Sequence, residues 1–394
     1  MLTRLRIENY KALRAVEISL TPIHAIIGPN DSGKTSILEA LYALASSAEK
    51  GIDAWFPGIW EGADLVWQRN PATSVVFEAT IVTESETVTY TLSMKFGMES
   101  RRVALESERL TSGQRILFGK SNPNQTRPRA TAEGDKAGLG EDAYRHAGEL
   151  RDAIRGVHMY RWDPRFLRLP AATDSNWRFK MEPTGFGLVR CLEDILGDDR
   201  SRFTELEQRF RKLFPEFKSI KFVTQPAFRT RETFARDVPS LQNVEGKGLA
   251  FQLQEGEALL PASQVSDGVL LVLAYLAILY LPEPPRFLLI EEPENGIHPK
   301  RLQEVIRILR SLVEEQDRTQ VIMTTHSPYL IDEMQPEEVT LCSKRDDGSV
   351  QTHRLSTIPA VKKQLDLFTL GEIWSAEGDE ELARQPADGT KGGD

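Results

Sequence analysis

The sequence predicts an α/β fold with a mixed central sheet, an N-terminal antiparallel β subdomain and a small helical insertion. The first observation is the apolar run Ile23–Ile27, which leads through a Gly-containing loop into a helix-like segment. The second is a pair of apolar runs, Phe287–Ile290 and Gln320–Thr325, which each end in polar residues as parallel strands of α/β proteins do. The third is an N-terminal third in which apolar and polar residues alternate, the pattern of half-buried antiparallel strands.

The composition is that of an ordinary soluble globular protein. The 394 residues are 40% hydrophobic and 27% charged. The two cysteines, Cys191 and Cys342, are far apart and lack CxxC spacing, which argues against a disulfide framework or a zinc site and suits a reducing cytoplasm. The N-terminus lacks the pattern of a signal peptide, and the apolar run Val269–Leu281 is too short to span a bilayer. We therefore expect a cytoplasmic protein without a membrane partner.

The charge distribution does not decide whether the protein binds nucleic acid. The net charge of −9 disfavours such a partner, but residues 101–240 carry an excess of Lys and Arg. This basic middle is compatible with an anionic partner such as nucleic acid, and equally with a solvated helical face.

The remaining elements follow from periodicity and breaker residues. We expect strands at 2–9, 13–20, 23–27, 74–83, 86–96, 101–110, 157–162, 219–225, 228–235, 248–254, 338–343 and 349–355. We expect helices at 36–45, 143–155, 269–281 and 370–377, and an amphipathic helix within 187–214. Residues 120–142 contain almost no large apolar side chains and are expected to form an exposed loop.

The segment after the strand 23–27 has the spacing GxxxxGK[ST] of a phosphate-binding loop. Its two glycines permit backbone conformations in which successive N–H groups surround a phosphate, and the following helix directs its positive end to the same anion. Lys34 would reach the β- and γ-phosphates of ATP, and the Thr35 hydroxyl would coordinate Mg²⁺. A chance match in a Gly-containing turn is the alternative. The expected nucleotide-binding residues are Gly28, Pro29, Asn30, Asp31, Ser32, Gly33, Lys34, Thr35 and Ser36.

Two carboxylates and a histidine follow the other apolar strands. Glu291 and Glu292 come at the end of the strand 287–290, where one carboxylate can hold Mg²⁺ and the next can deprotonate a water aimed at the γ-phosphate. The alternative is a pair of surface acids. His326 follows the strand 320–325, and its imidazole can hydrogen-bond a γ-phosphate, although a lone histidine usually has a structural role.

The segment Ser266-Asp267-Gly268 precedes the apolar helix 269–281. Ser and Asp are good N-cap residues, and Gly268 permits a close approach of backbone and ligand. By itself this pattern indicates only a capped, buried helix.

Together these segments resemble the ABC-type ATPase heads of the SMC, RecF and OLD (overcoming-lysogenization-defect) group, that is, bacterial AAA-family ATPases. The resemblance covers the P-loop GPNDSGKT, the signature-like SDG, the Walker B segment LLIEEPE, the D-loop-like ENGIHP and the switch THSP, in the expected order. ABC transporter subunits are less similar, because SDG replaces LSGGQ and Glu291-Glu292 replaces Asp-Glu.

The resemblance implies a P-loop NTPase that forms a homodimer by sandwiching two ATP molecules, each P-loop facing the signature segment of the other subunit. It implies that Glu291 joins Thr35 as a Mg²⁺ ligand, that Glu292 is the general base and that His326 senses the γ-phosphate. Asn295 would lie in the D-loop at the dimer interface. The residues of the contact made in trans would be Ser266, Asp267 and Gly268. The glutamine of the family's Q-loop is not located; Gln68 is a weak candidate, and the strand ending near Trp162 has none.

The resemblance also predicts the domain organisation. An ATPase head would span residues 1–375, with an N-terminal lobe at 1–163, a helical/β insertion at 164–245 and a C-terminal lobe at 246–375, followed by a polar tail at 376–394. The chain lacks the coiled-coil arm of SMC proteins and has no room after His326 for the Toprim nuclease of OLD proteins. A nuclease or toxin effector would then be a separate polypeptide acting in trans.

Three functions remain open. The first is an ATP hydrolase that acts in DNA maintenance or antiphage defence with a partner effector. The second is a slow ATP-dependent sensor or scaffold that holds and releases a toxic partner protein. The third, an ABC-transporter subunit, is disfavoured by the divergent signature and the β-rich N-terminal half.

Overall fold

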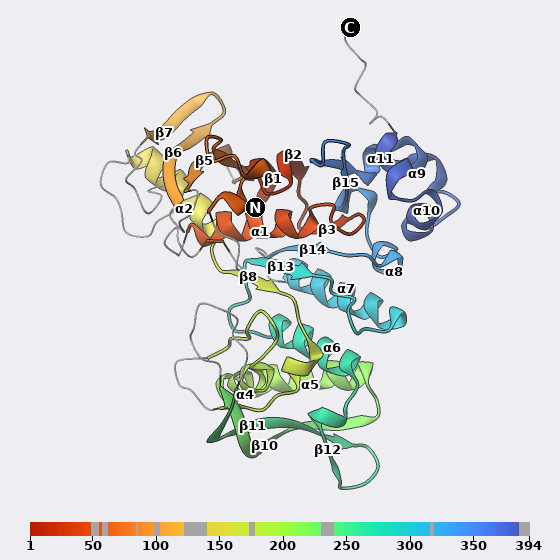
Figure 1. The fold of residues 1–394 in the computed structure, drawn as a ribbon. Coiled ribbons are helices and arrows are strands. Elements are labelled where there is room, and N and C mark those ends of the chain that lie inside the picture. Colours follow the sequence, from red (N-terminus) through yellow and green to blue (C-terminus); the bar gives the residue numbers. More distant parts are fainter. Residues whose placement is uncertain are drawn as a thin grey trace. The chain divides into compact units, whose positions relative to one another are not determined.

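The computed structural model describes residues 1–48, 55–56, 62–83, 86–97, 103–121, 140–172, 178–229, 240–315 and 319–385 (Figure 1). These residues form two compact units. Unit 1 comprises residues 1–158, 286–290 and 318–394, and unit 2 comprises residues 159–285 and 291–317. The two units are described separately below.

An antiparallel sheet in the order β2-β1-β4-β5-β6-β7 forms the N-terminal part of unit 1. Its strands are β1 Leu2–Tyr10, β2 Leu13–Ser19, β4 Val75–Val82, β5 Thr87–Phe96, β6 Val103–Ser112 and β7 Arg115–Ser121. In β4 every second side chain is buried, from Val75 to Ile81, because alternate residues of a strand face opposite sides of the sheet. The predicted antiparallel β subdomain is confirmed.

A second sheet of six strands has the order β16-β15-β3-β14-β13-β8. Its strands are β3 Ile23–Ile27, β8 Val157–Tyr160, β13 Phe287–Glu291, β14 Gln320–Thr324, β15 Val339–Lys344 and β16 Val350–Arg354. Every residue of β3 is buried, and β3 pairs in parallel with both β14 and β15. β15 and β16 are antiparallel, so the sheet is mixed, as predicted.

Helices complete unit 1. They are α1 Lys34–Ser46, α2 Glu141–Ile154, α8 Pro328–Ile331, α9 Pro359–Gln364, α10 Leu370–Glu377 and α11 Asp379–Arg384, with short 3₁₀ turns η2 Gly62–Leu65, η3 Trp67–Arg69, η5 Pro336–Glu338 and η6 Leu355–Thr357. α1 packs against β14. α11 lies within the segment 376–394 that the sequence predicts to be a polar tail; its Leu382 side chain is fully buried, and residues 386–394 lie outside the described residues.

The predicted loop 120–142 lies mostly outside the described residues. At its ends β7 extends to Ser121 and α2 begins at Glu141, two residues earlier than the predicted helix. Asp142 stabilises this early start because acidic side chains in the first turn interact favourably with the helix dipole.

Unit 2 is built from helices and a β-ribbon. Its helices are α3 Pro164–Leu167, α4 Leu188–Asp198, α5 Arg200–Leu213, η4 Ala262–Gln264, α6 Asp267–Leu279 and α7 Pro299–Glu315. Its strands are β9 Ala171–Ala172, β10 Phe217–Arg229, β11 Ser240–Leu253 and β12 Leu259–Pro261, in the order β10-β9-β11-β12 with an additional β10–β11 pairing. All residues of α6 from Val269 to Leu279 are buried, as expected for a helix that is apolar on every side.

Two features of unit 2 differ from the sequence prediction. The amphipathic helix predicted within 187–214 is confirmed as α5, but a second helix, α4, precedes it: Asp199 has an extended backbone and its carboxylate accepts hydrogen bonds from the N–H groups of Ser201 and Arg202, so it ends α4 and caps α5. The break predicted between strands 219–225 and 228–235 is wrong, since β10 continues through Pro226. The ladder tolerates Pro226 because its register shifts between Pro226 and Ala227.

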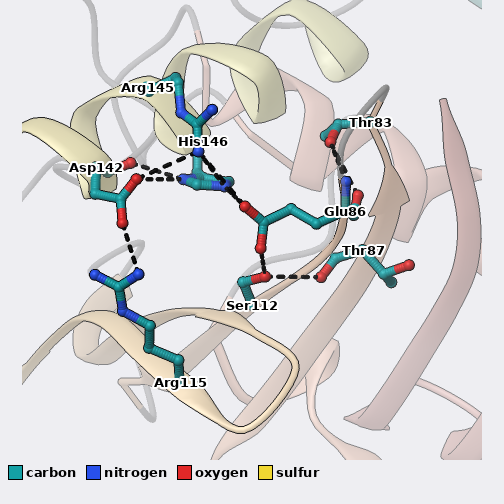
Figure 2. A network of polar contacts seen from close by, with 8 residues as sticks. All are labelled: Thr83, Glu86, Thr87, Ser112, Arg115, Asp142, Arg145 and His146. Carbon is teal, nitrogen blue, oxygen red and sulfur yellow. Dashed lines mark hydrogen bonds and ion pairs between the residues drawn. The ribbon is translucent and has the colours of Figure 1, made fainter.

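A polar network fixes α2 to the antiparallel sheet of unit 1 (Figure 2). His146 of α2 is 1% exposed, its Nε2 lies 2.6 Å from Glu86 Oε1, and its Nδ1 lies 2.7 Å from the Asp142 carbonyl oxygen. Glu86 also accepts a hydrogen bond from Ser112, and Arg115 pairs with Asp142 at 2.8 Å. Burial alone would lower the pKa of His146, but the Asp142 carbonyl and the Glu86 carboxylate raise it above 6.5.

This network predicts a pH-dependent contribution to stability. Because the folded-state pKa of His146 is raised, its contribution is complete below about pH 6.5 and is lost as the pH rises through the folded-state value. In His146→Gln, the fall in unfolding temperature between about pH 6 and pH 8 should shrink by roughly 2–4 °C relative to wild type, measured by scanning fluorimetry. His353→Gln is the comparison variant: the pKa of His353 is lowered, mainly by burial, so its contribution has the opposite sign and its removal should leave this fall the same or larger. An unchanged pH slope in His146→Gln would contradict the assignment.

Candidate nucleotide site

The loop after β3 has a conformation that only glycine permits at two positions. Gly28 has a φ of +137° and Gly33 a φ of +89°. A Cβ atom on Gly28 would lie 2.1 Å from the carbonyl oxygen of Cys342 in β15, and one on Gly33 would lie 2.6 Å from the Val350 side chain in β16. The loop therefore packs its backbone against its own sheet, the arrangement in which a glycine-rich loop can place backbone N–H groups around an anion.

The charged side chains of the loop are held in place. Lys34, the first residue of α1, is 7% exposed, and its Nζ donates hydrogen bonds to the carbonyl oxygens of Gly28 at 2.9 Å and Pro29 at 2.7 Å. Asp31 adopts a left-handed backbone conformation and forms an ion pair with Lys344. A buried ammonium group at the start of a helix favours a bound anion.

These residues fit ATP and Mg²⁺, which the fold implies. Ser32 is 1% exposed, and its Oγ has no hydrogen-bond partner among the residues that the structure describes. An unpaired buried hydroxyl within a glycine-rich loop can be satisfied by a phosphate oxygen. Thr35 and Ser36 lie in the first turn of α1. The Thr35 side chain is exposed, so the Thr35 hydroxyl can coordinate a metal ion.

β14 brings His326 to the same edge of the sheet as the loop. β14 pairs in parallel with β3, and Thr324 is the partner of Ile26. Thr325 donates its N–H to the Ile26 carbonyl at 3.1 Å, so the next residue, His326, emerges beside the end of β3. The sheet order also places β14 next to β13. By contrast, burial and then Arg354 lower the pKa of His24 within β3 to about 3, so this histidine is a neutral structural residue.

In unit 2 the carboxylates occupy a tight turn. Glu291 is 9% exposed, and Glu292 has a φ of +51°, which is unusual for a residue with a side chain. Asn295 donates its side-chain N–H to Glu292 Oε2 at 2.6 Å and its backbone N–H to the Glu292 carbonyl at 3.1 Å. Asn295 therefore orients the carboxylate that the sequence identifies as a base.

The signature-like segment borders a pocket of about 320 Å³ in unit 2. Ser266 is the N-cap of α6 by position, but its side chain makes no capping hydrogen bond, so its hydroxyl does not satisfy its own helix. Asp267 pairs with Arg168 of the segment after α3. The residues lining the pocket are Phe214, Glu216, Ser266, Asp267, Gly268, Val269, Gly296, His298 and Arg301.

The predicted site residues thus fall into two groups. Unit 1 brings together residues 28–36 and His326, and unit 2 brings Ser266, Asp267 and Gly268 close to the turn that contains Asn295. Gln68 is exposed in η3 with a left-handed backbone. Sequence reasoning missed Arg161 and Arg168, because the long-range pairing of a lone arginine with an acid has no local sequence signal.

Comparisons with known proteins agree with this geometry. Residues 23–332 match the family described as "AAA domain, putative AbiEii toxin, Type IV TA system". The chain belongs to this family. It is similar to the OLD nuclease of Thermus scotoductus, with 25% identity over 90% of this chain and 64% of the relative, so the match spans less than two thirds of the relative's length. A shorter match joins 11% of the chain to 12% of the DNA replication and repair protein RecF of Vibrio vulnificus, at 50% identity.

The fold is that of an SMC head. An SMC head bound to the C-terminal winged-helix domain of ScpA matches with a TM-score of 0.51 and 13% identity over 89% of this chain and 96% of that chain. An SMC head from Pyrococcus furiosus, with an extended coiled coil and bound to the C-terminal domain of ScpA, matches with a TM-score of 0.50 and 12% identity over 93% of this chain and 99% of that chain. The family and fold identify a P-loop ATPase of the SMC/OLD type. Within the part of the chain that the structure describes, no helix is long and apolar enough to cross a bilayer.

The packing of Gly28 predicts a large effect of substitution. Gly28→Ala should lower the unfolding temperature and abolish nucleotide binding, because the added methyl group collides with the Cys342 carbonyl. Gly348→Ala is the matched control: its φ of +79° is also positive, but no atom lies within 4 Å of its Cβ position. The control should cost only about 1 kcal/mol of backbone strain. Equal losses in the two variants, measured by thermal unfolding and calorimetric ATP titration, would contradict the role of the contact.

Proposed function

We propose that this protein binds ATP with Mg²⁺, hydrolyses it, and dimerises around two ATP molecules. The observation that carries the proposal is the edge of the parallel strands β3 and β14, where a buried lysine, a glycine-bounded loop and His326 come together within one unit. Ligands of α/β sheets bind at the carboxyl ends of parallel strands.

Each residue has a role that suits its chemistry. Lys34 and the 28–36 loop bind the phosphates, and Thr35 and Glu291 hold the Mg²⁺, which lowers the charge of the triphosphate. Glu292, oriented by Asn295, takes the proton of the attacking water. His326 hydrogen-bonds the γ-phosphate and responds to its loss.

The side chain of Ser266 at the start of α6 supports the proposed dimer. The Ser266 hydroxyl does not cap its own helix, and this hydroxyl together with the positive end of the α6 dipole suits the γ-phosphate of an ATP held by a second subunit. Asp267 in this segment would repel a phosphate, and its pairing with Arg168 offsets that charge.

We further propose a cytoplasmic role in DNA maintenance or antiphage defence with a partner effector, a nuclease or toxin, and with nucleic acid as an additional ligand. The support is the similarity to an OLD nuclease and to the repair protein RecF. The alternative is a slow ATP-dependent sensor that holds and releases a toxic partner, which the family description of a toxin–antitoxin system favours.

The assignment of the base predicts the effect of Glu292→Gln. This variant should lower the rate of ATP hydrolysis by roughly 10²-fold or more while leaving ATP affinity within about threefold of wild type, because only the proton acceptor is lost. Phosphate release and calorimetric binding measure the two quantities. Glu283→Gln, an exposed acid of the same unit, is the control. Full hydrolysis in Glu292→Gln would refute the assignment.

Slow ATP turnover by the wild-type protein, together with a protein that copurifies with it, would favour the alternative function as a sensor.

The trans contact predicts an ATP-dependent dimer. With ATP, the Glu292→Gln protein should double its mass in light scattering, and adding Ser266→Arg should keep it monomeric with ATP affinity unchanged, because the larger side chain fills the space for the second subunit's phosphate. Ser263→Arg, an exposed serine three residues earlier, should still dimerise. Dimerisation of the Ser266→Arg protein would count against the sandwich.

A further inference from the structure

Arg161 faces Glu291 within unit 2. Its Nη1 lies 3.6 Å from Glu291 Oε2, and the Arg161 side chain is 68% exposed whereas that of Glu291 is 9% exposed. A carboxylate that is largely removed from water needs a positive partner, since an uncompensated buried charge is costly. Arg161 supplies that charge.

Buried aromatic rings and a backbone hydrogen bond fix the position of Arg161 in the chain, so its side chain starts from a defined place beside Glu291. Tyr160 and Trp162 are 3% and 9% exposed, and their rings lie 5.1 Å apart, with Trp162 in contact with Tyr275 at 4.5 Å. Arg161 donates its backbone N–H to the Pro183 carbonyl at 2.9 Å. Because alternate residues of an extended segment point in opposite directions, the two buried aromatic rings turn the guanidinium away from the core.

The pair is looser than a second arginine–carboxylate pair in the same segment. Arg165 binds Asp163 through both its Nε and its Nη2, at 2.9 Å and 2.6 Å from Oδ2. Arg161 approaches Glu291 through one nitrogen, at a distance beyond a hydrogen bond. A long, exposed arginine in single contact can leave its partner when another cation takes its place.

We propose that Arg161 is an exchangeable counterion for Glu291. It neutralises this carboxylate while no divalent cation is bound and releases it when Mg²⁺ arrives with the nucleotide, so Arg161 and Mg²⁺ compete for the same oxygens. This inference rests on the proposed role of Glu291 as a Mg²⁺ ligand. Arg161 then has a positioning role. Its competition for Glu291 lowers the affinity for Mg²⁺, although Arg161 itself does not bind the metal.

Competition predicts that removing Arg161 strengthens the response to Mg²⁺. For binding of the non-hydrolysable analogue AMP-PNP, followed by calorimetry at stepped Mg²⁺ concentrations, Arg161→Ala should lower the half-saturating Mg²⁺ concentration by roughly threefold to tenfold. Arg161→Lys should lie between Arg161→Ala and wild type. Arg165→Ala is the matched control and should leave the value unchanged. An unchanged or higher value in Arg161→Ala would overturn the proposal.

A double-mutant cycle tests the pair without nucleotide. Without Mg²⁺, Arg161→Ala should lower the unfolding temperature in the wild-type background but not in Glu291→Gln, because the amide leaves no charge to neutralise. Equal losses in both backgrounds would overturn the pairing.

Different results would contradict the proposed function and the proposed exchange. If wild type binds no AMP-PNP at any Mg²⁺ concentration, the proposed function fails, and the exchange with it. If wild type binds in a Mg²⁺-dependent way and Arg161→Ala behaves identically, only the exchange fails.

Discussion

The contact between Gly28 and the Cys342 carbonyl is the constraint on which the candidate nucleotide site depends. β3 is buried at every residue and lies between β14 and β15, so the chain can leave the sheet only at the carboxyl end of β3. At that point the backbone of β15 leaves no space for a side chain. A residue without a side chain is therefore needed at position 28, and the loop that follows leads into α1 at Lys34. The proposed phosphate-binding role of the loop depends on this lack of space.

Two residues of the candidate site have unusual backbone conformations. Asp31 and Glu292 both have positive φ values, which side-chain-bearing residues adopt only when the surrounding contacts compensate for the strain. For Glu292 that compensation includes two hydrogen bonds from Asn295. For Asp31 it includes the ion pair with Lys344. Such strained positions are common where a protein holds a group ready for a ligand.

Arginine side chains compensate the negative charge of acidic residues in the candidate site. Two acids of the candidate site in unit 2 are each paired with an arginine, Glu291 with Arg161 and Asp267 with Arg168. A site for a polyanion that contains its own carboxylates must offset their repulsion, and nearby guanidinium groups do this without a bound metal. At Glu291 the proposed exchange, and at Asp267 the ion pair with Arg168, both reduce the negative charge that a polyanion would meet.

The sequence by itself determined the elements and the chemistry of the candidate site, because these depend on local patterns. The GxxxxGK[ST] spacing, the apolar runs ending in Glu291 and His326, and the alternation of the N-terminal strands each reflect a backbone requirement within a few residues. Only the tertiary structure decided the break at Asp199, the continuity of β10 through Pro226, the crowding at Gly28 and the pairing of Arg161 with Glu291. Each of these depends on packing, capping or pairing that residue spacing alone leaves open. Arg161 and Glu291 are 130 positions apart, and no local pattern connects a charge with a partner at that separation.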